Sequence, residues 1–87
     1  MDRLTIDGPL NRWMEKTRLA SYELAIAAGL HRSEVSRVRS GRQGFPQRLV
    51  AYLRSVGISE TEIGLMQEEQ SVLMRRRELQ KRERQAA

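Results

Sequence analysis

Arginine and serine side chains surround two valines in one short stretch of the chain, residues 32–40. The stretch reads Arg-Ser-Glu-Val-Ser-Arg-Val-Arg-Ser, with Val35 and Val38 as its apolar residues. A guanidinium group can donate paired hydrogen bonds to a phosphate or to a guanine edge, and a serine hydroxyl can donate or accept one. In a helix, the two valines share one side and polar groups cover the rest. We therefore predict a helix that is held by a narrow apolar stripe and presents hydrogen-bonding groups to a polar or anionic partner.

Basic residues are concentrated here and at the end of the chain. The net charge is +5, and residues 31–54 contain six arginines and one acid, Glu34. Residues 55–74 contain four glutamates and no base, whereas residues 75–87 contain six basic residues and two acidic ones. This distribution favours contacts with a polyanion over an ordinary solvated surface. The basic tail fits three roles: a second phosphate-binding arm, a partner for acidic residues 60–69 of another subunit, or a disordered, solubilising end.

The residue types that most catalytic and metal sites need are scarce. The chain has 87 residues, no cysteine and one histidine, His31. It shows no paired carboxylates for acid–base work, no glycine-rich phosphate loop and no nucleophile near a base. We therefore expect a binding protein rather than an enzyme, with no cofactor, metal or small-molecule substrate. The absence of a long apolar run and of a signal-peptide pattern predicts a cytoplasmic protein that does not contact membranes.

Apolar periodicity and turn residues predict an all-α fold. The expected helices run from about residue 9 to 18, from 21 to 28, from 31 or 32 to 40, from 46 to 56, and from 60 into the basic tail. Gly29 and Gly57 are expected to end the second and fourth helices. The expected N-cap residues are Asp7 or Gly8 for the first helix, Ser21 for the second, and Ser59, with Glu62 completing a capping box, for the last.

The last helix carries two neighbouring apolar stripes. One contains Ile63, Met66, Gln70 and Leu73, and the other contains Leu65, Val72 and Leu79. Together they are wider than one small domain can cover, which favours self-association. We predict oligomerisation contacts at Ile63, Met66, Val72 and Leu73.

A longer pattern of residues links these elements. It consists of Leu19, Glu23-Leu24-Ala25, Gly29, Leu30, His31, Ser33-Glu34-Val35-Ser36 and Gly41. In this register the chain resembles the lambda-repressor and Cro-like helix-turn-helix regulators over about residues 10–59. His31 departs from the family, in which a serine or threonine usually caps the recognition helix.

This resemblance implies a compact four-helix domain that contains a helix-turn-helix, in residues 1–58, followed by an oligomerisation or partner-binding helix and tail, in residues 59–87. The recognition helix, at about 32–40, is expected to enter the major groove of double-stranded DNA. The implied base contacts are Arg32, Ser33, Ser36 and Arg37. The implied phosphate contacts are Ser21, Arg39, Arg42 and Gln43.

The layout also resembles, on length and helix order, the lysogeny activators of lambdoid phages, which tetramerise through their C-terminal helix. We expect a transcription regulator of phage or mobile-element type, a repressor or an activator, that binds DNA as a homodimer or homotetramer, with RNA polymerase as a further candidate partner. The alternative is a protein-binding module on the same fold, such as an antitoxin or an RNA polymerase inhibitor, that acts through the last helix.

Overall fold

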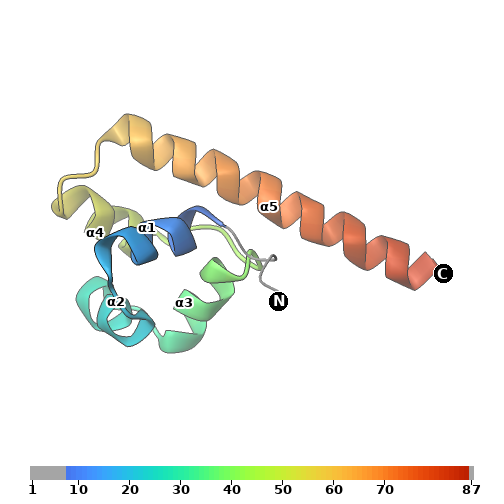
Figure 1. Ribbon diagram of the computed structural model, residues 1–87, viewed down its shortest axis with the longest axis horizontal. Coiled ribbons are helices and arrows are strands. Elements are labelled where there is room, and N and C mark those ends of the chain that lie inside the picture. The colour runs from blue at the N-terminus through green and yellow to red at the C-terminus, as the bar shows by residue number, and fades with distance from the viewer. Residues whose placement is uncertain (1–7, 87) are drawn as a thin grey trace.

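The chain folds into five helices with no strand in residues 8–86, the part that the structure, a computed structural model, describes (Figure 1). The all-α prediction is confirmed for this part of the chain. The first four helices form a compact unit, and the fifth lies along it and extends well beyond it. The helices are α1 (Pro9–Thr17), α2 (Ser21–Ala28), α3 (Arg32–Arg39), α4 (Gln47–Ser55) and α5 (Glu60–Ala86).

The core lies where all five helices meet. α2 packs against α3 and α4, α1 packs against α3 and α5, and α4 packs against α5. Val35 and Val38 of α3 are 0% and 1% exposed, as their spacing predicted. The other buried apolar residues are Leu10, Met14, Leu24, Ala25, Ala28, Leu49, Leu53 and Ile63. Trp13 packs at the edge of this core, with its ring perpendicular to that of Tyr52 at a centroid distance of 6.3 Å.

The helix boundaries lie within one residue of those expected from the sequence. Gly29 ends α2 with a φ of +72°, a left-handed conformation that glycine adopts at least cost. Ser21 is the first residue of α2 rather than its N-cap, because the Glu23 carboxylate accepts the Ala20 N–H at 2.8 Å and Ala20 takes the cap position. Arg18 is the left-handed C-cap of α1 rather than its last helical residue.

The N-caps of α1 and α5 lie where the sequence placed them. Gly8 is the N-cap of α1, while Asp7, the other candidate, lies outside the described residues. The Ser59 hydroxyl accepts the Glu62 N–H at 3.1 Å, so Ser59 caps the first turn of α5.

The two stripes of α5 have different environments. Ile63 is buried in the core, Met66 packs against it, Gln70 is buried, and Leu73 is half-buried. Leu65, Val72 and Leu79 are 56%, 49% and 54% exposed. Of the predicted oligomerisation contacts, Ile63, Met66 and Leu73 are therefore used within the chain, and Val72 is the exposed one. We call the set Leu65, Val72 and Leu79 the exposed stripe of α5.

We predict that Gly41→Ala destabilises the fold by about 2–4 kcal/mol. Gly41 is buried at a φ of +77°, and a Cβ there would lie 2.7 Å from Cγ of Leu73. The matched control is Gly64→Ala, where a Cβ meets no atom within 4 Å and the helix gains about 0.5–1 kcal/mol. Urea unfolding of both variants measures the difference. Equal stabilities would show that α5 does not pack on the turn after α3.

Candidate nucleic-acid interface

The turn between α2 and α3 is fixed by backbone and side-chain hydrogen bonds. The Leu30 N–H donates to the Ala25 carbonyl at 2.8 Å, closing the end of α2. Nη1 of Arg48, on α4, donates to the Gly29 carbonyl at 2.8 Å. These bonds supply donors to carbonyl groups that the end of a helix leaves unpaired. The angle at which α3 leaves α2 is therefore held by α4 as well as by the core.

The first turn of α3 is capped by Glu34. Its carboxylate accepts the His31 N–H at 3.1 Å, and the His31 side chain is exposed. The Glu34 carboxylate thus bonds to the backbone at the start of its own helix and forms no ion pair with an arginine within residues 8–86. The carboxylate also lies in the first helical turn, where the helix dipole favours negative charge.

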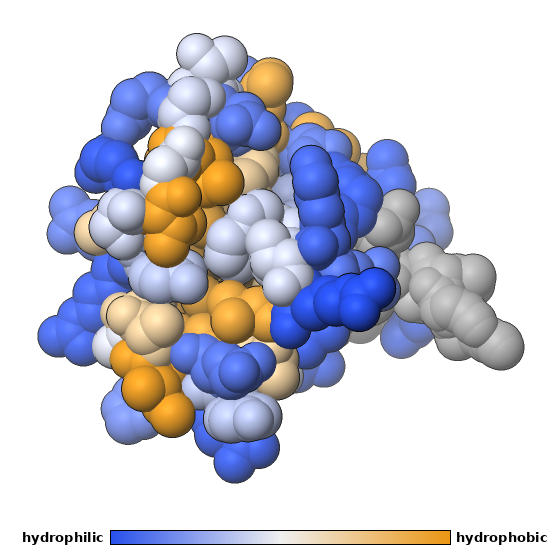
Figure 2. All heavy atoms as spheres, turned by 60° about the vertical axis from the view of Figure 1, so that its left-hand side comes forward, coloured by the Kyte–Doolittle hydropathy of each residue, from blue (hydrophilic) through white to orange (hydrophobic). Residues whose placement is uncertain are grey.

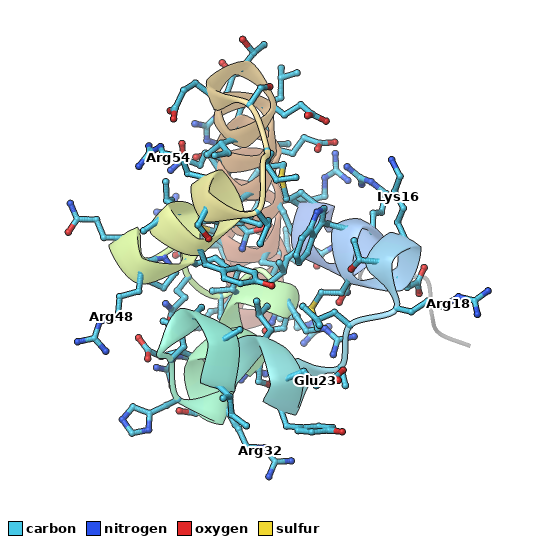
Figure 3. All side chains as sticks on the ribbon, turned by 90° about the vertical axis from the view of Figure 1, so that its left-hand side faces the viewer. Lys16, Arg18, Glu23, Arg32, Arg48 and Arg54 are labelled. Carbon is cyan, nitrogen blue, oxygen red and sulfur yellow. The ribbon has the colours of Figure 1, made fainter. Side chains whose placement is uncertain are left out.

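The outer side of α3 is polar and open to solvent. Arg32, Ser33, Ser36 and Arg37, the predicted base contacts, are all exposed. Arg32 has no hydrogen bond or ion pair within residues 8–86 and extends away from the domain at the start of α3 (Figure 3). Nε of Arg37 donates to Oε1 of Gln43 at 2.7 Å. The structure therefore brings these four side chains to one surface, with Gln43 orienting Arg37.

Two of the predicted phosphate contacts lie together where α1, α2 and α3 meet. The half-buried guanidinium of Arg39 donates from Nε to Oδ1 of Asn11 and from Nη1 to Oγ of Ser21. Arg39 therefore links three helices, a structural role that its sequence position did not reveal. A polar pocket of about 260 Å³ opens here, lined by Asn11, Ser21, Ser36, Arg39 and Ser40.

The other two predicted phosphate contacts lie in the turn after α3. Gln43 is half-buried and bonded to Arg37, whereas Arg42 is exposed. Arg42 lies at one side of a groove of about 610 Å³ between this turn and the last part of α5. The groove is strongly basic, with one carboxylate among its residues Gly41, Arg42, Met74, Arg77, Glu78, Gln80, Lys81 and Arg84. The groove therefore brings basic residues of the tail beside Arg42, in the turn that follows α3.

A buried amide joins α5 to the end of α3. Gln70 is 1% exposed, and its Nε2 donates to the carbonyls of Val38 and Gln43, both at 2.8 Å. The buried Oε1 of Gln70 accepts no hydrogen bond within the described residues, so the two bonds donated by Nε2 are the ones that bridge these elements. Gln70 therefore ties α5 to the last turn of α3 and to the residue that orients Arg37. From the sequence it belonged to an apolar stripe, with no sign of this role.

Sequence reasoning also missed an exposed apolar pair on α2. Tyr22 and Ile26 are 55% and 79% exposed and lie one helical turn apart. They line an open depression with Arg32 and Ser33 at the start of α3. Apolar residues reach the surface between polar ones on the side of the molecule that Figure 2 brings forward. The spacing of Tyr22 and Ile26, on the side of α2 opposite Leu24 and Ala28, was the available signal.

The side of the molecule away from Arg32 carries an internal ion pair. Arg54, at the end of α4, donates to the carboxylate of Glu60 at the start of α5, and Figure 3 shows Arg54 far from Arg32. The hydrogen bond from Arg54 lowers the pKa of Glu60, and the same bond raises the pKa of Arg54. The small stabilisation of this exposed pair is therefore present at neutral pH and is lost as the pH falls through the lowered pKa of Glu60.

We predict that Gln70→Ala lowers the free energy of unfolding by about 2–4 kcal/mol, because it removes two buried hydrogen bonds and leaves a cavity. The control is Gln67→Ala, on an exposed position of the same helix, which should change stability by less than about 0.5 kcal/mol. Urea unfolding followed by circular dichroism compares the two variants. Equal effects would contradict the bridging role of Gln70.

Comparison of the chain with models of protein families, with curated proteins and with solved structures found no match in any of the three. Within the described residues, no group of histidine, cysteine and acidic side chains is arranged to hold a metal ion, and no helix is both long and apolar enough to cross a bilayer. The interface is therefore interpreted from its own chemistry.

Proposed function

We propose that this protein is a sequence-specific regulator of transcription that binds double-stranded DNA with α3 in the major groove. The observation that carries the proposal is the exposure of Arg32, Ser33, Ser36 and Arg37 on a helix whose two valines are fully buried. A helix that is propped by a second helix and has a free polar side is the arrangement that major-groove readers use.

The arginines supply the base discrimination in this proposal. Arg32 and Arg37 each donate two hydrogen bonds to O6 and N7 of a guanine, worth about 1–3 kcal/mol of discrimination for each arginine. Ser33 and Ser36 either donate or accept, so they add contacts with little sequence preference of their own. The hydrogen bond that Nε of Arg37 donates to Gln43 fixes the guanidinium before binding, which lowers the entropy that DNA binding costs.

Phosphate groups are proposed to bind on both sides of α3. On one side, the polar pocket beside Ser21 and Arg39 lies at the N-terminus of α2, where backbone N–H groups and the helix dipole favour an anion. On the other side, Arg42 and the basic groove residues Arg77, Lys81 and Arg84 neutralise the backbone farther along the duplex. This proposal takes the first of the three roles weighed for the tail, a second phosphate-binding arm.

One specific observation supports the alternative, a protein-binding module. The exposed stripe Leu65, Val72 and Leu79 offers an apolar surface on α5 that DNA binding through α3 does not use. A module that acts through α5 binds its partner independently of Arg32 and Arg37. DNA binding by arginine variants therefore separates the two functions.

We predict that Arg32→Ala and Arg37→Ala each reduce the preference for a selected site by about 5- to 100-fold, because each removes a bidentate guanine contact. The duplex is selected from a random-sequence library with the wild-type protein. Binding to this duplex and to a scrambled one is measured by fluorescence anisotropy at several salt concentrations. Wild type should show a steep loss of affinity as salt rises.

The matched control is Arg54→Ala, which removes the same charge from the side of the domain away from α3. It should leave the site preference unchanged. If no sequence is selected, or if all three variants keep the wild-type preference, the major-groove proposal is wrong and the protein-binding module is favoured.

A neighbouring pair of basic residues tests the phosphate-binding role of the tail. Lys81 lines the basic groove, whereas Arg82 does not. Nε of Arg82 lies 3.6 Å from Oε2 of Glu78, with which it forms an ion pair. We predict that Lys81→Ala weakens binding to selected and scrambled duplexes alike and lowers the slope of log K against log salt by about one. Arg82→Ala should change the slope less. The reverse order of effects would place the DNA elsewhere.

A further inference from the structure

The exposed apolar residues of α5 form a regular seam. Leu65, Val72 and Leu79 are separated by seven residues, so each is rotated by only about 20° from the one before it. The stripe that contains Ile63 and Gln70 packs into the domain, whereas the three seam residues are about half-exposed. Val72 also lines a shallow groove with Gly8, Pro9 and Arg12 at the start of α1. The seam therefore borders the domain at Val72 and is open to solvent over residues 65–79, just over half of α5.

Charged residues flank the seam in each of the two intervals between its apolar residues, and the sign of the charge differs between the intervals. Glu68 and Glu69 lie between Leu65 and Val72, and Arg75 and Arg76 lie between Val72 and Leu79. The order along the helix is thus apolar, acidic, apolar, basic, apolar, and it is centred on Val72. A second helix that runs in the opposite direction therefore presents apolar residues at the same levels, with basic residues where the first helix has acidic ones.

We propose that α5 pairs with α5 of a second copy of this chain in an antiparallel arrangement, with the two-fold axis at Val72. In this register Leu65 of each copy contacts Leu79 of the other, and the two Val72 side chains meet. The glutamates of each copy lie beside the arginines of the other. A parallel pair in register instead places glutamates beside glutamates and arginines beside arginines, which repel each other.

The charged groups that this pairing needs are available. Glu68 and Arg75 are exposed and have no hydrogen-bond or ion-pair partner within residues 8–86. Glu69 already pairs with Arg12 of α1 at 2.6 Å, and Arg76 lies in the same shallow groove. The contact between Glu68 and Arg75 of the second copy, made twice by symmetry, is therefore the ionic contribution gained on association.

The interface is narrow, and its strength depends on salt. Three apolar residues from each copy bury less surface than a standard interface, so we expect a dissociation constant on the order of micromolar at low salt. Leu65, Val72 and Leu79 are not part of the buried core, so pairing through them does not disturb it. This inference stands apart from the proposed function, because it requires neither DNA nor α3.

Charge reversal tests both the pairing and its direction, with sedimentation equilibrium at low salt as the measurement. Glu68→Arg and Arg75→Glu should each weaken self-association at least tenfold, and the double variant Glu68→Arg/Arg75→Glu should restore it. Gln67→Arg adds positive charge away from the seam, on the side facing α4, and should leave the association unchanged. A wild-type protein that remains monomeric at millimolar concentration, or single reversals that strengthen association, would overturn the proposal.

Disulfide trapping reads the register directly, because the chain contains no cysteine of its own. An equimolar mixture of Leu65→Cys and Leu79→Cys should yield a cross-linked dimer that contains one of each variant under mild oxidation. Neither variant alone should cross-link efficiently, since identical positions lie about 20 Å apart in the antiparallel pair. Efficient cross-linking of Leu65→Cys alone indicates a parallel pair and contradicts the proposal. Circular dichroism of each variant checks that the fold is unchanged.

Discussion

The whole arrangement depends on the burial of two valines. α3 has Val35 and Val38 as its only apolar side chains, and both are almost completely removed from solvent. Each contributes about 1.5–3 kcal/mol relative to an exposed side chain, which is a large share of the stability of a domain this small. Because the apolar contact of α3 is confined to this narrow stripe, most of its circumference is free for arginine and serine. The polar outer side of α3 is therefore a direct consequence of this packing.

Contacts from outside the α2–α3 pair add precision to this packing. Arg48 bonds to the turn, Arg39 bonds to α1 and α2, and Gln70 bonds to the end of α3 from α5. Each of these polar groups bonds to a backbone or side-chain group of another helix or turn. The last helix is thus part of the scaffold that holds α3, and its outer side is the surface proposed for pairing with a second copy. If both proposals hold, α5 connects DNA recognition with self-association.

Local features of the sequence were enough to predict the helices and the outer side of α3. The spacing of Val35 and Val38 predicts that both are buried on one side of a helix. The residue type of Gly29 predicts the left-handed conformation that ends α2. Both features depend on the local sequence alone. Ser21 was wrongly expected to be a cap because the competing carboxylate of Glu23 and the distant guanidinium of Arg39 both act on that turn. Periodicity likewise could not tell which stripe of α5 faces the domain, because both stripes are apolar and the choice depends on tertiary packing.

The most direct test of the account is a map of backbone amide chemical shifts upon addition of a duplex that the protein itself has selected. We predict that the largest changes fall on residues 32–37 and on the start of α2, with small changes at Leu65 and Val72 on the outer side of α5. A scrambled duplex should give smaller changes at 32–37. Unchanged signals from α3, or the largest changes along the outer side of α5, would contradict the central claim.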